Sequence, residues 1–545
     1  MRKFTLNLLI LFLAVSFSYA GGIVTNTNQS SAWVRLLVRD ATTEIDAVYF
    51  NPAGLTKLND GFHFSISTQY ITQRKEVLNN YPFLNDGLYK GEVKIPIFPG
   101  VYAAYKTGSV VFSLGLNPVG GGGEATFDRG LPSFEMEISD LVPGLQAAGQ
   151  NVTAYSINSF LEGTSTFLGL QGGVSIALSN EFSFFVGGRY INATNTYNGY
   201  LKDVTITLGG IPTPANTFFT NVASQYTAGA ALATAGGTGM QPLIDGGAGP
   251  LTFAQAEGMG IIDAVTRAQL EGGLTALGMD PTGMTLAVAQ ASYYGAASSL
   301  TASAADASAT SNLLSNQEAD VKQKGWGFTT IIGFNYAPSD KLNIGFKYES
   351  ATRIELKNET AKDFTVGYTS NGVPITMFPE GELIRADIPA MVSLGFDYQI
   401  SSKLSVTSGA HYYFDKSVNY GRSLDGVAVK NEDVIDKNYW EIGLGLEYAL
   451  TDQFFVSAGY LSANSGVSEN YNTDMSYSMS SNTVAGGLKY ALSEKMALNL
   501  GVGYTKYNDG SRVFNHHLEG EMDKIVTESY TKDNLFIGVG FDFSF

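Results

Sequence analysis

The chain ends in a segment, Leu535 to Phe545, in which apolar residues alternate strictly with aromatic, small or polar ones. Successive side chains of a β-strand point to opposite faces, so this pattern predicts a strand with one fully apolar face. That face carries Leu535, Ile537, Val539, Phe541, Phe543 and Phe545. A tilted strand of about nine to eleven residues crosses the hydrocarbon core of a bilayer. The segment is therefore predicted to be a membrane-spanning β-strand.

Both ends of the chain indicate the same compartment. A terminal aromatic residue such as Phe545 resembles the assembly signal of Gram-negative outer-membrane barrels. Residues 1–4 are cationic, residues 6–17 are apolar, and Ser18-Tyr19-Ala20 is a small-x-small cleavage site. This order is typical of a secretory signal peptide, which we place at residues 1–20. We expect the mature chain in the outer membrane of a Gram-negative bacterium.

Composition supports this interpretation and excludes several classes of function. Charged residues are 15% of the chain, against about a quarter in soluble domains, while Gly (62), Phe (33) and Tyr (30) are abundant. After the signal, no apolar run reaches the roughly eighteen residues of a membrane helix. The net charge of −17 argues against nucleic-acid binding. Because the chain has no cysteine, it can form no disulfide, thiolate metal site or cysteine nucleophile.

Alternating segments recur along the chain from Gly61 onwards, and they predict fourteen strands. The predicted ranges are 61–73, 95–106, 110–127, 161–178, 182–202, 323–338, 341–354, 388–400, 403–420, 437–450, 453–466, 481–492, 496–508 and 532–545. Short and long connections alternate between them, as tight periplasmic turns and longer outside loops do in membrane barrels. We therefore predict an all-β membrane protein, a fourteen-stranded antiparallel transmembrane barrel over residues 61–545.

The connection at residues 203–322 differs from the others because it is long and rich in Ala and Gly. Helical spacing of apolar residues recurs at 254–277 and at 286–317. We expect an extracellular insert with two short helices packed on the barrel mouth. The alternative is a mobile surface insert with no role in ligand binding.

The segment Asp46 to Leu55 (DAVYFNPAGL) resembles the signature of the FadL family, outer-membrane channels for long-chain fatty acids and other hydrophobic molecules. In that family an Asn-Pro-Ala motif follows an N-terminal helical hatch that plugs a fourteen-stranded barrel. The resemblance implies a hatch at residues 21–60, anchored by Asn51, Pro52 and Ala53. Proline fixes φ and lacks an amide proton, so the motif equally suits a simple turn into the first strand.

Two further stretches resemble strands of this family, Val111 to Glu124 and Asp387 to Tyr398. The first contains Asn117, Pro118, Gly120, Gly121, Gly122 and Gly123. Proline removes a ladder donor and glycine permits bends, so this strand is predicted to lose pairing locally. The resemblance implies a lateral gate there, through which cargo leaves into the membrane. The alternative is an ordinary bulge without an opening.

Arg189 and Lys347 fall on the polar faces of their predicted strands. Inside a barrel such cations could bind the carboxylate of a ligand, or they could pair with acids of the lumen wall. The four histidines lack a recognised metal spacing, and we expect His516 and His517 to be solvated in an outside loop. No catalytic or phosphate-binding motif is present, so we expect no enzyme activity, no cofactor and no metal.

The sequence therefore predicts a channel for passive uptake of hydrophobic small molecules, in particular long-chain fatty acids, with lateral release at the broken third strand. We expect a monomer that binds its cargo, membrane lipids and detergents, but no nucleic acid. Two alternatives stay open. One is a general porin with an open lumen, and the other is a related barrel that serves as a scaffold for a protein partner or a secretion apparatus.

Overall fold

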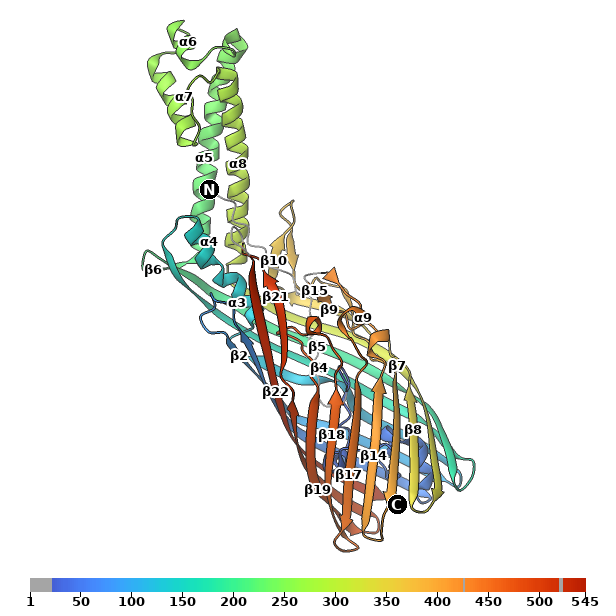
Figure 1. Cartoon of the computed structure of the whole chain (residues 1–545). Coiled ribbons are helices and arrows are strands. Elements are labelled where there is room, and N and C mark those ends of the chain that lie inside the picture. The colour runs from blue at the N-terminus through green and yellow to red at the C-terminus, as the bar shows by residue number, and fades with distance from the viewer. Residues whose placement is uncertain (1–21, 425–426, 519–522) are drawn as a thin grey trace.

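The computed structural model describes residues 22–424, 427–518 and 523–545, so the predicted signal peptide lies outside the described residues. Fourteen strands of the described residues form one closed antiparallel barrel (Figure 1). They are β1 (Gly61–Asn79), β2 (Leu88–Thr107), β3 (Val110–Phe127), β4 (Val152–Ala177), β5 (Phe182–Leu208), β7 (Gln317–Ser339), β8 (Leu342–Glu349), β13 (Met391–Gln399), β14 (Leu404–Tyr413), β17 (Trp440–Ala449), β18 (Phe454–Asn464), β19 (Ser481–Ser493), β20 (Met496–Tyr507) and β22 (Lys524–Ser544). Each pairs with the next, and β22 pairs with β1 to close the barrel. The predicted fold is confirmed.

The barrel has one end of tight turns and one end of long loops (Figure 1). On the loop side the sheet is extended by β6 (Ile211–Pro214), β9 (Glu355–Lys362), β12 (Leu383–Arg385) and β21 (Gly510–His516). The loops also hold two small hairpins, β10 (Thr365–Tyr368) with β11 (Pro374–Thr376) and β15 (Ser423–Leu424) with β16 (Val427–Ala428). Short helical turns complete them: α3 (Pro132–Ser139), α4 (Leu141–Ala147), α9 (Asn431–Val434), η3 (Asp415–Ser417) and η4 (Glu469–Tyr471).

The outer surface of the barrel carries an apolar band with aromatic edges. On β17 the outward side chains are Trp440, Ile442, Leu444, Leu446 and Tyr448, which are between 37 and 52% exposed. The strand thus has aromatic residues at both ends and aliphatic residues between them. Such a band is what the acyl chains and interfaces of a bilayer require. The alternation predicted for the last strand is also present, since Ile537 is 51% exposed and Phe536 is 3% exposed.

The N-terminal segment, residues 22–58, lies inside the barrel and is called the plug below. It contains α1 (Ser31–Leu36), α2 (Ala47–Phe50) and the short helix η1 (Pro52–Lys57). Ser30 caps α1, since its hydroxyl accepts a 3.0 Å hydrogen bond from the amide of Trp33. α1 packs against β17 to β20, β22 and β1, whereas η1 packs against β3, β4, β5 and β7. The plug therefore contacts the wall around most of the barrel.

Within the predicted insert 203–322, residues 215–313 form a long helical hairpin, because β5 continues to Leu208 and β7 begins at Gln317. The hairpin corrects the prediction of two short helices packed on the barrel mouth. α5 (Ala215–Leu243) and α8 (Leu286–Leu313) pack side by side and project away from the loop end of the barrel, and η2 (Ile244–Ala248), α6 (Phe253–Gly258) and α7 (Ala264–Ala276) lie at the tip (Figure 1). Alanine favours long helices, and small side chains let the two axes approach closely. None of the helices in the described residues is long and apolar enough to span a membrane.

Candidate functional site

The wall of the barrel is interrupted between β2 and β3. Their register runs to Lys94 opposite Glu124, stops, and resumes at Val101 opposite Leu116. Over this interval β3 stays paired with β4, with register shifts on both sides of Gly120. Residues 95–100 of β2 and 117–123 of β3 thus form a break in the ladder, called the β2–β3 break below.

Prolines and glycines on both strands explain the break. On β3, Pro118 has no amide proton to donate, and Gly121 (φ 85°) and Gly123 (φ 69°) adopt left-handed backbone conformations that other residues rarely adopt. On β2, Pro96 and Pro99 also lack the ladder donor. The sequence prediction located the β3 side of the break and missed these two prolines, although two prolines inside one predicted strand were a visible signal.

The plug covers the break from inside. The amide of Asn26 donates a 3.0 Å hydrogen bond to the carbonyl of Val119. The side chain of Gln29 donates to the carbonyl of Pro118 at 2.8 Å and accepts from the side-chain amide of Asn117 at 2.6 Å. These bonds satisfy groups on β3 that a continuous neighbouring strand would otherwise engage.

The inner surface around the break is apolar. Val119 and Phe98 are 2% and 4% exposed, and Ile95 and Phe167 are buried beside them. They belong to one hydrophobic cluster that continues along the inner faces of β4, β5, β7 and β9, and whose further members include Leu161, Ile191, Ala193, Tyr197, Leu201, Val321 and Leu356. An apolar inner face is unlike the polar interior of a water-filled barrel.

The predicted anchor motif lies deep inside the barrel, where three wall strands bind it. α2 ends at Phe50 and η1 begins at Pro52, with Asn51 between them. The Asn51 side chain donates to Asn335 of β7 at 2.7 Å and to the carbonyl of Thr42 at 3.0 Å. The hydroxyls of Ser175 on β4 and Ser183 on β5 donate to the carbonyls of Pro52 and Ala53 at 2.6 and 2.8 Å.

Arg189 and Lys347 are brought together by a shared acid, Glu349. The Arg189 guanidinium donates two hydrogen bonds to the Glu349 carboxylate, at 2.6 and 3.0 Å, and the Lys347 ammonium lies 2.8 Å from it. Lys347 also donates to the carbonyl of Tyr49 in the plug at 2.7 Å. The structure therefore matches the alternative in which these cations pair with an acid of the lumen wall, and a role toward cargo stays a prediction.

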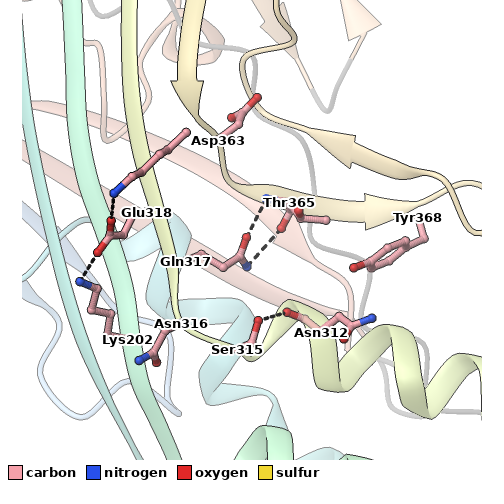
Figure 2. A pocket seen from close by; sticks show the side chains of 10 residues that line it. Lys202, Asn312, Ser315, Asn316, Gln317, Glu318, Asp363, Thr365 and Tyr368 are labelled. Carbon is pink, nitrogen blue, oxygen red and sulfur yellow. Dashed lines mark hydrogen bonds and ion pairs between the residues drawn. The ribbon is translucent and has the colours of Figure 1, made fainter.

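A polar pocket of about 520 Å³ lies where α8 meets the outer ends of the barrel strands (Figure 2). Lys202 and Lys362 both form ion pairs with Glu318. The side chain of Gln317 accepts from the amide of Thr365 at 2.7 Å. These contacts join the ends of β5, β7, β9 and β10, and the side chain of Gln317 also donates to the carbonyl of Leu313 at the end of α8 at 2.8 Å. The polar lining makes this pocket unsuited to a hydrophobic ligand.

The histidines occupy separate places. The predicted solvation of His516 is wrong, because β21 extends beyond β20 and places the imidazole 2.7 Å from Asp140. His517 is exposed and lies 2.8 Å from Asp523. His411 lies between Asp40 of the plug and Glu441 of β17. Within the part of the chain that the structure describes, no group of three or more His, Asp or Glu residues could hold a metal ion.

The family described as "Outer membrane protein transport protein (OMPP1/FadL/TodX)" matches residues 258–545, more than half of the chain. The chain belongs to the FadL family. It is thus an outer-membrane transport protein for hydrophobic compounds and not an enzyme, and its location in the outer membrane of a Gram-negative bacterium is confirmed. No curated protein sequence is significantly similar to it.

Solved structures share the FadL-family fold at low sequence identity. A FadL homologue from Pseudomonas aeruginosa has 13% identity and a TM-score of 0.56, covering 96% of this chain and 100% of its own. The deltaS2S3 mutant of TodX, a monoaromatic hydrocarbon channel, has 13% identity and a TM-score of 0.50, covering 95% of this chain and 99% of its own. Identity this low supports the fold alone.

Proposed function

We propose that this FadL-family protein takes up long-chain fatty acids or similar lipids without energy coupling and releases them sideways through the β2–β3 break. The observation that carries the proposal is the break itself, because it is lined with apolar side chains such as Ile95 and Phe98 and is covered by the plug. Each buried methylene contributes about 0.8 kcal/mol, so an acyl chain gains from a direct path into lipid and resists an aqueous exit.

The contacts of the plug support a local movement. Asn51, Pro52 and Ala53 bind three wall strands at one end of the plug. The segment over the break is joined to β3 by the hydrogen bonds of Asn26 and Gln29 and by the bridge between Thr25 and Gly120. We therefore propose that the motif anchors the plug while the segment before α1 moves aside.

A second candidate is a binding surface for a protein partner, and the projecting α5–α8 hairpin favours it. The hairpin exposes large apolar side chains, including Leu232 (74%), Met259 (67%) and Val265 (64%). Transport and partner binding make different demands on this element. Truncation of the hairpin should leave transport intact if transport is the function. It should abolish partner binding if the hairpin is the binding surface.

The experiment is uptake of radiolabelled oleate by Gram-negative cells that lack their own long-chain fatty-acid channel. A matched variant deletes residues 221–310 and rejoins the hairpin at its root, where the hydroxyls of Thr220 and Ser311 lie 2.8 Å apart. We expect the full chain and the truncated variant to restore uptake equally. Failure of the full chain to restore uptake, although it assembles in the outer membrane, would contradict the proposed function.

A further inference from the structure

The outward face of β7 changes its chemistry in a fixed order from the membrane towards the loops. From Tyr336 to Trp326 it is an apolar band with aromatic ends, which are 42% and 65% exposed, and Ile332 lies between them. This span is about the length that crosses the hydrocarbon core. The next outward side chains towards the loop end are Lys324 and Lys322, both exposed. Because the long loops of a membrane barrel are extracellular, the two lysines lie where the outer leaflet ends.

Further cations lie beside these lysines on and next to β9. Lys357 is directly opposite Lys324 in the register of β7 and β9. Arg353 precedes β9 on the same face, and its side chain is 69% exposed. Exposed and buried residues alternate from 353 to 359, so these cations point away from the lumen. The four cations, called the basic strip below, are Lys322, Lys324, Arg353 and Lys357, and the acids among them are Glu355 and Glu359.

The basic strip carries more positive charge than its acids compensate. Glu359 pairs with Lys324 at 2.7 Å, and Glu355 pairs with Arg353. Four cations thus face two acids, although the whole chain has a net charge of −17. Lys324 and Lys357 repel each other across the two strands, and a phosphate between them would accept charge-assisted hydrogen bonds from both. Basic clusters beside a bilayer attract anionic lipid head groups in this way.

The polar pocket of Figure 2 lies farther along the same strand. Glu318, which lines the pocket, is four residues beyond Lys322, or about 13 Å. The two cations of the pocket, Lys202 and Lys362, are matched by two acids, Glu318 and Asp363. The other lining side chains carry amides and hydroxyls, which donate hydrogen bonds to sugar hydroxyls and accept from them. These side chains are Asn312, Ser315, Asn316, Gln317, Thr365 and Tyr368.

The order along this face is therefore apolar band, basic strip and polar pocket. A phosphorylated glycolipid has the same order, because its acyl chains are innermost, its phosphates lie at the membrane surface and its sugars extend outwards. We propose that the basic strip and the polar pocket bind a phosphorylated glycolipid of the outer leaflet, with a phosphate between Lys324 and Lys357 and sugars in the pocket. The site is independent of the proposed uptake, because the strip lies on the outer surface of the barrel and not in the lumen.

The first experiment measures the affinity of the purified full chain in detergent for bisphosphorylated lipid A and for phosphatidylglycerol, an anionic lipid without sugars. The variant K322Q/K324Q/K357Q removes three charges of the strip, and K322R/K324R/K357R keeps them. The control K90Q/K416Q/K506Q removes three exposed lysines elsewhere. We expect the Gln variant to bind lipid A about tenfold or more weakly, and the Arg variant and the control to bind it like the wild type.

The second experiment tests the pocket with lipid A extended by two inner-core sugars. The variant N312A/Y368A shortens two lining side chains, and the control N221A/Y294A makes the same replacements at exposed positions of α5 and α8. We expect the wild type and the control to bind the extended glycolipid more tightly than lipid A. N312A/Y368A should bind lipid A like the wild type and lose the additional affinity for the extended form.

Three results would overturn the proposal, in chains that keep heat-modifiable gel mobility. Binding of lipid A by K322Q/K324Q/K357Q at wild-type affinity would exclude the strip as the phosphate site. Equal wild-type affinity for lipid A and phosphatidylglycerol would show that the strip attracts any anionic lipid. Unchanged binding of the extended glycolipid by N312A/Y368A would exclude the pocket as the sugar site. None of these measurements depends on fatty-acid uptake, so a failure of the proposed function would leave them unaffected.

Discussion

The side-chain amide of Gln29 donates a 2.8 Å hydrogen bond to the backbone carbonyl of Pro118. This bond joins the plug to β3 at the place where the pairing of β3 with β2 is interrupted. The plug thus forms hydrogen bonds with the barrel wall at the β2–β3 break.

Replacing Asn51 with Ala should loosen the plug. The variant removes the donor to Asn335 and to the carbonyl of Thr42. The Asn335 oxygen keeps its bond from Asn343, whereas loss of the bond to the buried Thr42 carbonyl costs about 1–3 kcal/mol. We expect the basic residues of the plug, Arg35 and Arg39, to become sensitive to trypsin in a barrel that still shows heat-modifiable gel mobility. The control is Asn180→Ala at an exposed turn, which should digest like the wild type. Unchanged protection of the plug in Asn51→Ala would show that the motif is only a turn.

Replacing Glu349 with Gln should destabilise the barrel. Arg189 and Lys347 would then be buried cations without a compensating acid, and breaking a buried pair in this way costs about 3–5 kcal/mol. We expect the temperature of the heat-modifiable transition to fall and the affinity for palmitate to stay at its wild-type value. Tighter binding of palmitate by this variant would instead show that Arg189 and Lys347 bind the cargo carboxylate once Glu349 no longer occupies them.

The contact between α3 and β21 should weaken as pH rises. Burial raises the pKa of Glu137 on α3 from 4.5 to about 8, with His516 lowering and Asp140 raising it further. Burial lowers the pKa of His516, but the hydrogen bond to Asp140 and the negative charges of Asp140 and its neighbouring acids together raise it more, so that the net shift is upward. Both groups keep a proton in the folded loop that they lose when it unfolds, so stability falls with rising pH.

Hydrogen exchange of residues 131–149 measures this effect. Exchange should accelerate from pH 4.5 towards pH 8 through Glu137, and above pH 6.5 through His516 as well. Glu137→Gln and His516→Gln each remove one titrating group, so each should flatten its own part of the profile. A wild-type exchange profile without pH dependence, after correction for the intrinsic rate, would contradict the prediction.

The barrel could be predicted from the sequence because the alternation of residues along a strand shows directly which side chains face lipid. Lipid on the outside and the plug on the inside impose an alternation that is clear in many of the strands, as in Leu535 to Phe545. The ends of the strands could be predicted less well. β1 was predicted to stop at residue 73 and extends to Asn79, because the outward face becomes polar beyond the membrane and the apolar signal is lost.

The site could be predicted only in part, because its contacts are long-range. The Pro118 and glycine run marked the break, since those residues act through local backbone geometry. Nothing local marks Gln29 as the partner of Asn117, or Glu349 as the partner of Arg189, because each pair is fixed by how the plug and the strands pack. Helical spacing at 286–317 located α8 and that at 254–277 located the helices of the tip, whereas α5 was missed because an alanine-rich helix carries little hydrophobic periodicity.

Lateral release through the β2–β3 break requires the plug segment over the break to move. The chain has no cysteine, so a thiol reagent would react with no cysteine other than an introduced pair. Gln29→Cys and Asn117→Cys place thiols where two side chains now share a 2.6 Å hydrogen bond. A short reducible thiol cross-linker would lock the segment to β3. Each single cysteine variant, treated with the same reagent, is the control.

The measurement is uptake of radiolabelled oleate by cells carrying the locked protein, before and after reduction of the cross-link. We expect the lock to abolish uptake and reduction of the cross-link to restore uptake to the level of the single cysteine controls. Heat-modifiable mobility should be unchanged throughout. Uptake by the locked protein at the rate of the reduced protein would contradict release through the β2–β3 break.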